Sequence, residues 1–146
     1  MNLKQAVCFI IILFSAFLQA QKEAGNWYFG DRAGLSFNSG SPVPLTNGSI
    51  EAIEGCASIS DRNGNLLFYT DGETVHDRTH GVLQNGDNLK GNVSSSQSAI
   101  IVPRPTMPER YFIFTVDKPN YFDEPNDPIE GVHFSEVDMS LNNGLG

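Results

Sequence analysis

Two histidines and two aspartates lie close together in the middle of the chain, and residues of these types can bind a metal ion or act as acid and base. His76 and His80 are four residues apart, the spacing with which a helix presents two imidazoles to zinc. Neither lies in a segment with helical periodicity, and in an extended chain they would be about 13 Å apart. Asp71 and Asp77 could form the carboxylate pair that glycoside hydrolysis requires, but both flank turns, where aspartate is common. We therefore predict neither a zinc site nor a catalytic carboxylate pair.

Two polar segments resemble calcium-binding loops in composition. Residues 61–65, DRNGN, carry alternating oxygen ligands, but an EF-hand loop needs glycine at its sixth position and an acidic residue at its twelfth. Here Gly64 is fourth and Gly72 is twelfth, so we expect a hairpin turn. Residues 123–128, DEPNDP, form an acidic loop that we expect to be solvated, because a Ca²⁺ site needs six or more converging oxygens. Calcium binding at this second loop stays open.

The remaining reactive residues have no catalytic spacing. Cys56 lies in an apolar run and is expected to be a small buried side chain. The serines at 94–96 lack the G-x-S-x-G pattern of a nucleophile elbow, and His133, beside Phe134 in a strand-like run, is expected to be structural. We predict a protein that is not an enzyme, with no catalytic, cofactor-binding or metal-ligating residues.

Aromatic residues are abundant and could serve either packing or recognition. Most are expected to fill the space between sheets. Tyr121 and Phe122 could stack on a sugar or contact a protein if their loop is exposed. The aromatics concerned are Trp27, Tyr28, Phe29, Tyr69, Phe112, Phe114, Tyr121 and Phe122.

The first twenty residues, MNLKQAVCFIIILFSAFLQA, have the composition of a secretory signal peptide. Lys4 precedes an apolar run over 6–18, and the small residue Ala20 precedes the expected cleavage point. The run is too short to span a bilayer of about 30 Å comfortably. We therefore expect export, no membrane span after removal of residues 1–20, and a mature chain of residues 21–146. Because Cys8 is lost with the leader, Cys56 could form no disulfide within the mature chain.

The charge balance restricts the partners. The chain has 9 basic and 17 acidic residues, for a net charge of −8. A nucleic-acid-binding protein needs a basic patch to neutralise phosphates, so we exclude that class. The expected partners are other protein domains or surface glycans.

The elements that would position these residues are all β-strands. Short runs of β-prone residues alternate with Gly, Asn, Asp and Pro, and no window after the leader has helical periodicity. The expected strands cover 26–29, 34–37, 42–45, 56–60, 66–70, 73–76, 81–83, 98–102, 111–115 and 131–138.

The strand pattern repeats once. Ala57 matches Ala99 at an offset of 42, and Thr70 matches Thr115 at an offset of 45. A period of about 40–50 residues is typical of a propeller blade, an antiparallel four-stranded sheet whose two apolar faces must both be covered. We predict an all-β, β-propeller-like fold of about two to three blades, with residues 21–146 the N-terminal portion of a longer domain. The alternative is a β-sandwich.

The amino-acid sequences of the expected strands resemble those of a known family. NWYFGDRAGLSF, EGCASISDRNGNLLFYTDGETVHD, SSSQSAIIVPRP, RYFIFTVD and GVHFSEVDMSLNNGLG are similar to the N-terminal region of large exported proteins of gliding Gram-negative bacteria. In that family the region looks like the start of a β-propeller, often followed by immunoglobulin-like repeats and a sorting domain for type IX secretion. The resemblance covers most of residues 25–146, without a sorting domain, and implies no catalytic residues. It implies a secreted or cell-surface scaffold or adhesion protein; the alternative is a secreted carbohydrate-binding or polysaccharide-degrading protein.

Overall fold

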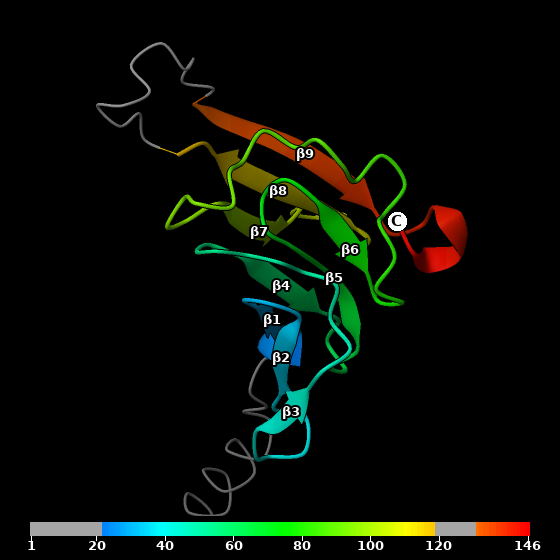
Figure 1. Ribbon diagram of the computed structural model, residues 1–146. Helices are drawn as coiled ribbons and strands as arrows, with labels where there is room; N and C mark the ends of the chain where they lie inside the picture. Colours follow the sequence, from blue (N-terminus) through cyan, green and yellow to red (C-terminus); the bar gives the residue numbers. More distant parts are fainter. Residues whose placement is uncertain (1–21, 119–130) are drawn as a thin grey trace, which may run out of the picture.

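The computed structural model describes residues 22–118 and 131–146, and these residues form an all-β structure (Figure 1). They build three antiparallel sheets of three strands each, in chain order, so the predicted fold class is confirmed at this level. The elements are η1 Lys22–Ala24, β1 Asn26–Phe29, β2 Ala33–Ser36, β3 Val43–Leu45, β4 Ala57–Ser60, β5 Leu66–Thr70, β6 Val75–Asp77, β7 Ala99–Pro103, β8 Arg110–Val116, β9 Val132–Asp138 and η2 Asn142–Gly144.

Some predictions lie outside the described residues. These are the signal peptide at 1–20 and the acidic loop at 123–128 with Tyr121 and Phe122. Within residues 22–118 and 131–146, no helix is long and apolar enough to cross a bilayer.

The hairpin of β4 and β5 shows why the predicted strands form where they do. The Asp61 carboxylate accepts hydrogen bonds from the N–H groups of Asn63 at 2.8 Å and Asn65 at 2.9 Å, which closes the turn. Gly64 has φ of +91°, a conformation that side chains with a Cβ rarely adopt. The expected hairpin turn at 61–65 is therefore confirmed.

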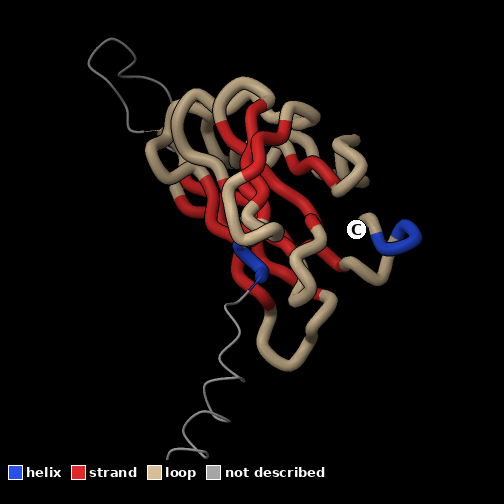
Figure 2. Tube along the Cα trace, turned by 90° about the horizontal axis from the view of Figure 1, so that it is seen from below, coloured by secondary structure: helices blue, strands red, loops and turns tan. Residues whose placement is uncertain are grey.

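The three sheets are stacked, and the middle one, β4–β5–β6, is covered on both sides (Figures 1 and 2). Phe68 and Tyr69 are consecutive in β5 and point to opposite faces, yet both have no exposed surface. Phe68 belongs to the core shared with β7–β8–β9, whose members are Ile59, Phe68, Val75, Leu83, Ala99, Tyr111, Ile113, Val137 and Met139. Tyr69 belongs to the smaller core shared with β1–β2–β3, with Tyr28, Ile50 and Ala52. The first strands of the sheets are neighbours, since β4 contacts both β1 and β7.

The strand register supports the repeat but changes its alignment. Ala57 pairs with Thr70 and Ala99 with Thr115, as the matched residues require. However, Ala57 of the second sheet and Ala99 of the third sheet lie in the same core. The two faces that the sequence alignment matched therefore point toward each other, whereas equivalent faces of stacked repeats would point in the same direction. If each sheet repeats the previous one along the stack, the Ile59–Phe68 pair corresponds instead to Ile100–Phe114, a shift of one residue in each strand.

Two details of the predicted blades are wrong for the described residues. Each sheet has three strands instead of four; the run 81–83 contributes one bridge, between Val82 and His76. The bridge is made by the Leu83 N–H donating to the carbonyl of Val75 and the Asp77 N–H donating to that of Gly81. The pairing ends in the turn where the Gly86 N–H donates to the carbonyl of Leu83. A blade needs cover on both faces, and the runs 100–102 and 112–114 fit strands buried on both sides, but their sheet is covered on one face alone: Ile100 is 52% exposed.

Candidate functional site

A cluster of polar aromatic residues joins the first and second sheets. The histidine–tyrosine cluster consists of Tyr28, Asn47, Tyr69, His76 and His80. The Tyr69 ring stacks on Tyr28, with centroids 4.4 Å apart, and on His76, with centroids 5.2 Å apart. Because these rings come from β1, β5 and β6, the cluster holds the two sheets together.

His80 is the hydrogen-bonding centre of this cluster. It follows β6 with φ of +69°, its Nδ1 lies 3.0 Å from the Tyr69 hydroxyl, and its Nε2 lies 2.7 Å from Asn47 Nδ2. The Tyr28 hydroxyl donates to Asn47 Oδ1 at 3.2 Å, which orients the amide so that its N–H group faces His80. His80 Nε2 is then an acceptor, and the proton of the neutral ring is on Nδ1, directed at Tyr69.

Burial keeps the cluster uncharged. It lowers the pKa of His76, against the opposing effect of Asp71 and Asp77 and with a small contribution from His80. Burial also lowers the pKa of His80, opposed by Asp77. His76 Nδ1 is buried without a hydrogen-bond partner. The His76 ring stacked on Tyr69 and the His80 ring tilted against it pack the two sheets together.

The separation of about 13 Å holds for an extended chain, but residues 78–79 between the two histidines form a turn. The turn after β6 brings His80 back, so that both rings contact Tyr69, with the His80 centroid at 5.9 Å and that of His76 at 5.2 Å. Within the described part of the chain, no three His, Cys, Asp or Glu residues gather in a way that could hold a metal ion. The sequence could not show this approach because it depends on the positive φ of His80.

Asp71 and Asp77 have the turn role that the sequence predicted. Asp71 Oδ1 accepts the N–H groups of Glu73 at 2.9 Å and Thr74 at 2.7 Å. Asp77 Oδ1 accepts the N–H and the hydroxyl of Thr79, both at 2.6 Å. One oxygen of each carboxylate, Oδ1, is therefore engaged in the hydrogen bonds of a turn.

The structure also describes the surroundings of Cys56, of the serine run and of His133. Cys56 is a free, half-buried thiol whose pKa is raised by burial and by Asp71, which disfavours the thiolate. In the serine run, the Ser94 N–H donates to Asn92 Oδ1, and the Ser96 hydroxyl donates to Glu54 Oε2 at 2.8 Å. His133 lies in β9, as expected for a strand residue.

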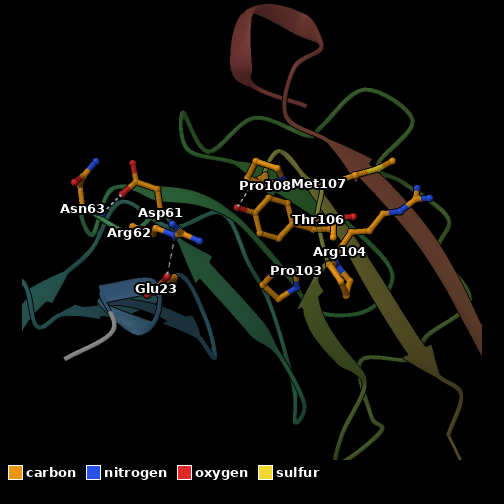
Figure 3. A pocket seen from close by; sticks show the side chains of 11 residues that line it. Glu23, Asp61, Arg62, Asn63, Pro103, Arg104, Thr106, Met107 and Pro108 are labelled. Carbon is orange, nitrogen blue, oxygen red and sulfur yellow. Dashed lines mark hydrogen bonds and ion pairs between the residues drawn. The ribbon is translucent and has the colours of Figure 1, made fainter. Parts of the chain in front are cut away.

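An open cleft of about 730 Å³ lies between the turn after β4 and the loop after β7 (Figure 3). Arg62 and Glu23 approach to 4.0 Å on one side, and the opposite wall is rich in proline. This cleft could not be predicted from the sequence, because three segments far apart in the chain form it. Its lining residues are Glu23, Asp61, Arg62, Asn63, Pro103, Arg104, Pro105, Thr106, Met107, Pro108 and Tyr111.

The third sheet leaves an apolar face exposed on the side away from the core. This outer face of sheet 3 consists of Ile100, Val102, Phe112, Phe114 and Phe134. The three phenylalanine rings have centroids 6.0–6.2 Å apart, and Phe134 is 66% exposed. The expectation that most aromatics are core is therefore wrong for this sheet.

The same side of sheet 3 also carries charged residues, since Phe112 pairs with Glu136 and Arg110 with Asp138, and these charges are paired with one another. Arg104 lies 5.5 Å above the Phe112 ring and binds Glu136 at 2.5 Å. Arg110 binds Glu136 at 2.8 Å and Asp138 at 2.9 Å. If the face were buried, each of these two arginines and two carboxylates would still have a partner of opposite charge.

The first sheet has a similar outer face at the other end of the stack. Trp27 and Phe29 alternate along β1 with the buried Asn26 and Tyr28, so they point away from the second sheet. Trp27 is 49% exposed and lies 4.9 Å from the Phe37 ring. The outer face of sheet 1 consists of Trp27, Phe29, Leu35, Phe37 and Pro44.

No family model, curated protein or solved structure matches the chain. The residues and their geometry are therefore the basis of the functional argument.

Proposed function

We propose that this chain is a non-enzymatic scaffold segment of an exported protein, secreted or held at the cell surface, that acts in adhesion or protein–protein interaction. The observation that carries the proposal is the exposed phenylalanine face of sheet 3. Monomeric proteins rarely expose a contiguous apolar patch of this kind unless it contacts a partner. The paired charges around it lower the cost of removing the face from water.

The stack itself supports a propeller-like arrangement. The middle sheet is buried on both faces by sheets of the same three-stranded type, and the first strands of the three sheets are neighbours. Sheets arranged around an axis are packed in this way. We propose that the three sheets are successive blades of such an array.

Export, a gliding association and type IX secretion rest on residues 1–20 and on the family resemblance. The test is a strain that lacks the gene, complemented with the wild-type chain, with Phe134→Glu or with Val82→Glu. Val82 is an exposed apolar residue of the middle sheet and serves as the matched control. We expect surface labelling of all three proteins and a loss of attachment for Phe134→Glu alone. A deletion strain that attaches and glides like wild type would contradict the proposal.

Carbohydrate binding is the second candidate, and the cleft is what favours it. Its volume lies within the roughly 300–1,000 Å³ of ligand sites, and Glu23, Asp61, Arg62 and Asn63 offer donors and acceptors. A glycan array on the purified protein tests it. Binding that Arg62→Ala abolishes would favour this candidate over the scaffold, whereas no bound glycan would remove it.

A further inference from the structure

We propose that the free edge of strand β9 binds an extended segment of another protein, which adds to sheet 3 as a fourth, antiparallel strand. The inference rests on the interaction function proposed above and names the kind of partner: a strand with apolar side chains at alternate positions and no acidic ones. Main-chain hydrogen bonds would hold the segment, and its apolar side chains would extend the outer face of sheet 3.

The hydrogen-bond pattern of sheet 3 determines which main-chain groups of β9 face outward. The Met139 N–H donates to the carbonyl of Glu109 at 2.8 Å, in register with the pairing of β8 and β9. Hydrogen-bonded pairs alternate along an antiparallel ladder, so the odd-numbered residues of β9 bond to β8. The N–H and C=O groups of Val132, Phe134 and Glu136 therefore point away from the sheet, and in the described part of the chain they have no hydrogen-bond partner.

β9 lacks the usual features that protect the free edge of a sheet. Such edges are commonly short, bulged or interrupted by proline or lysine, because unpaired main-chain groups otherwise pair with another chain. β9 is 7 residues long, has the sequence VHFSEVD, and pairs with β8 without a register shift. Its two acidic residues, Glu136 and Asp138, are bound by Arg110 of β8, so their side chains are directed over the sheet and away from the edge.

The middle sheet shows how this chain closes an equivalent edge. Its last strand, β6, directs the N–H and C=O groups of Val75 and Asp77 outward, and each of these groups has a partner in the segment that follows the strand. For example, the Val75 N–H donates to the carbonyl of Gly86 at 2.6 Å, and the Val75 carbonyl accepts the Leu83 N–H at 2.9 Å. The last strand of sheet 1, β3, has Pro44 at its centre, which has no N–H to offer. Among the last strands of the three sheets, β9 is therefore the one whose edge the described chain leaves open.

The side chains along the edge determine what the added strand should carry. Phe134 is the outermost residue of an apolar row, Ile100–Phe114–Phe134, that crosses sheet 3, and Val132 beside it is 71% exposed. A residue directly opposite either one would lie on the same face, with its Cβ about 4.5–5.5 Å away, where apolar pairs stabilise a sheet. The net charge of −8 disfavours an acidic segment and also a second copy of this chain. The partner that fits is a neutral, apolar strand of a different protein.

The first experiment is fluorescence anisotropy of a labelled peptide with blocked ends, Thr-Val-Thr-Val-Thr-Val-Thr, titrated with the purified chain. We expect saturable binding in which the three valines lie opposite Val132, Phe134 and Glu136. N-methylation of the three valines should weaken binding by about 10-fold or more, because it removes the donors that face the edge. N-methylation of the threonines, whose N–H groups would face away from β9, should change binding by less than about 2-fold.

A pair of protein variants tests the same contact from the other side. Val132→Pro removes an outward N–H at the first residue of the strand, where proline is tolerated, and should weaken peptide binding by about 5-fold. Val132→Thr keeps the N–H and the branched shape and should bind like wild type. In the wild type, the peptide should slow amide hydrogen exchange at Phe134 and leave it unchanged at Ser135, which already bonds to β8. Circular dichroism of each variant ensures that weaker binding is not a loss of folding.

Several outcomes would overturn the added strand. An absence of peptide binding up to about 1 mM, or equal effects of methylated valines and methylated threonines, would show that the edge does not pair with an extended main chain. A mass that rises with concentration and returns to that of one chain in Val132→Pro would make a second copy the occupant.

These failures are distinct from a failure of the scaffold function. An attachment defect of Phe134→Glu without peptide binding would keep the scaffold and remove the added strand. A deletion strain that attaches and glides like wild type would remove the scaffold even if the peptide binds.

Discussion

His76 and His80 carry imidazole rings that the fold holds in the neutral state. Burial is the first cause of the lowered pKa in both, and the nearby carboxylates, Asp77 for both and Asp71 for His76, oppose it without reversing it. The unfolded chain, in which histidine has its ordinary pKa near 6.5, therefore binds protons more readily than the folded chain.

This difference predicts a loss of stability in mild acid. The free energy of unfolding should be at its full value above pH 6.5 and should fall as the pH decreases from there toward the lowered pKa of the folded state. Urea titrations between pH 7.5 and 5.5 measure it, above the range in which most carboxylates titrate. His76→Phe keeps the ring against Tyr69 and should flatten the dependence. The same slope in His76→Phe, His80→Gln and wild type would contradict the assignment.

The second prediction at the residue scale concerns the Tyr69 hydroxyl. It accepts the Ser49 N–H at 2.9 Å and contacts His80 Nδ1, so Tyr69→Phe leaves both groups without this partner. We expect a loss of about 1–3 kcal/mol in the free energy of unfolding. Tyr111→Phe is the matched control, because its hydroxyl makes one longer contact, 3.4 Å to the carbonyl of Pro108. Equal losses for the two variants would show that the cluster has no special role.

At the scale of elements, the turn between β4 and β5 also binds the first sheet. Asn38 Nδ2 donates to the carbonyl of Gly64 at 2.8 Å, and a Cβ on Gly64 would collide with the Asn38 side chain. Gly40 also has a positive φ, +85°, but a Cβ there would meet no atom within 4 Å.

We expect the same substitution to lower the free energy of unfolding by different amounts at these two glycines. Gly40→Ala should cost about 1 kcal/mol, the strain of a side chain at positive φ. Gly64→Ala should cost more, because it also displaces Asn38 from the contact between turn and sheet. Thermal unfolding of both variants measures the difference. Restoration by Asn38→Gly in the Gly64→Ala background would confirm the collision, and equal costs for the two substitutions would contradict it.

The strands could be predicted from the sequence because their signals are local. The hairpin at 56–70 is specified by Asp61, Gly64 and two flanking β-prone runs, and each lies within a few residues of the atoms it controls. Which face of each repeated sheet points toward the next sheet could not be predicted in the same way. Side chains in a strand alternate with a period of two, so an alignment error of one residue turns a whole sheet over. The contact of His80 with Asn47 could not be predicted either, because it joins residues 33 positions apart in the sequence.

At the scale of the whole molecule, the middle sheet belongs to both cores, so the stack should unfold as one unit. Phe68 lies in the core toward sheet 3, while Trp27, the one tryptophan of the chain, lies on sheet 1 at the other end. Loss of the second core would remove the sheet on which sheet 1 packs, because Tyr69 is adjacent to Phe68 in the same strand.

Phe68→Ala should therefore destabilise the whole stack by about 3–5 kcal/mol, the cost of truncating a buried phenylalanine. Phe134→Ala makes the same chemical change at a residue that is 66% exposed and should cost far less in the monomer. Urea unfolding followed by Trp27 fluorescence and by circular dichroism should give coincident transitions in both variants. If Trp27 fluorescence changed at the wild-type midpoint in Phe68→Ala while circular dichroism changed earlier, sheet 1 would be independent of the second core. The stack would then be a row of separate sheets.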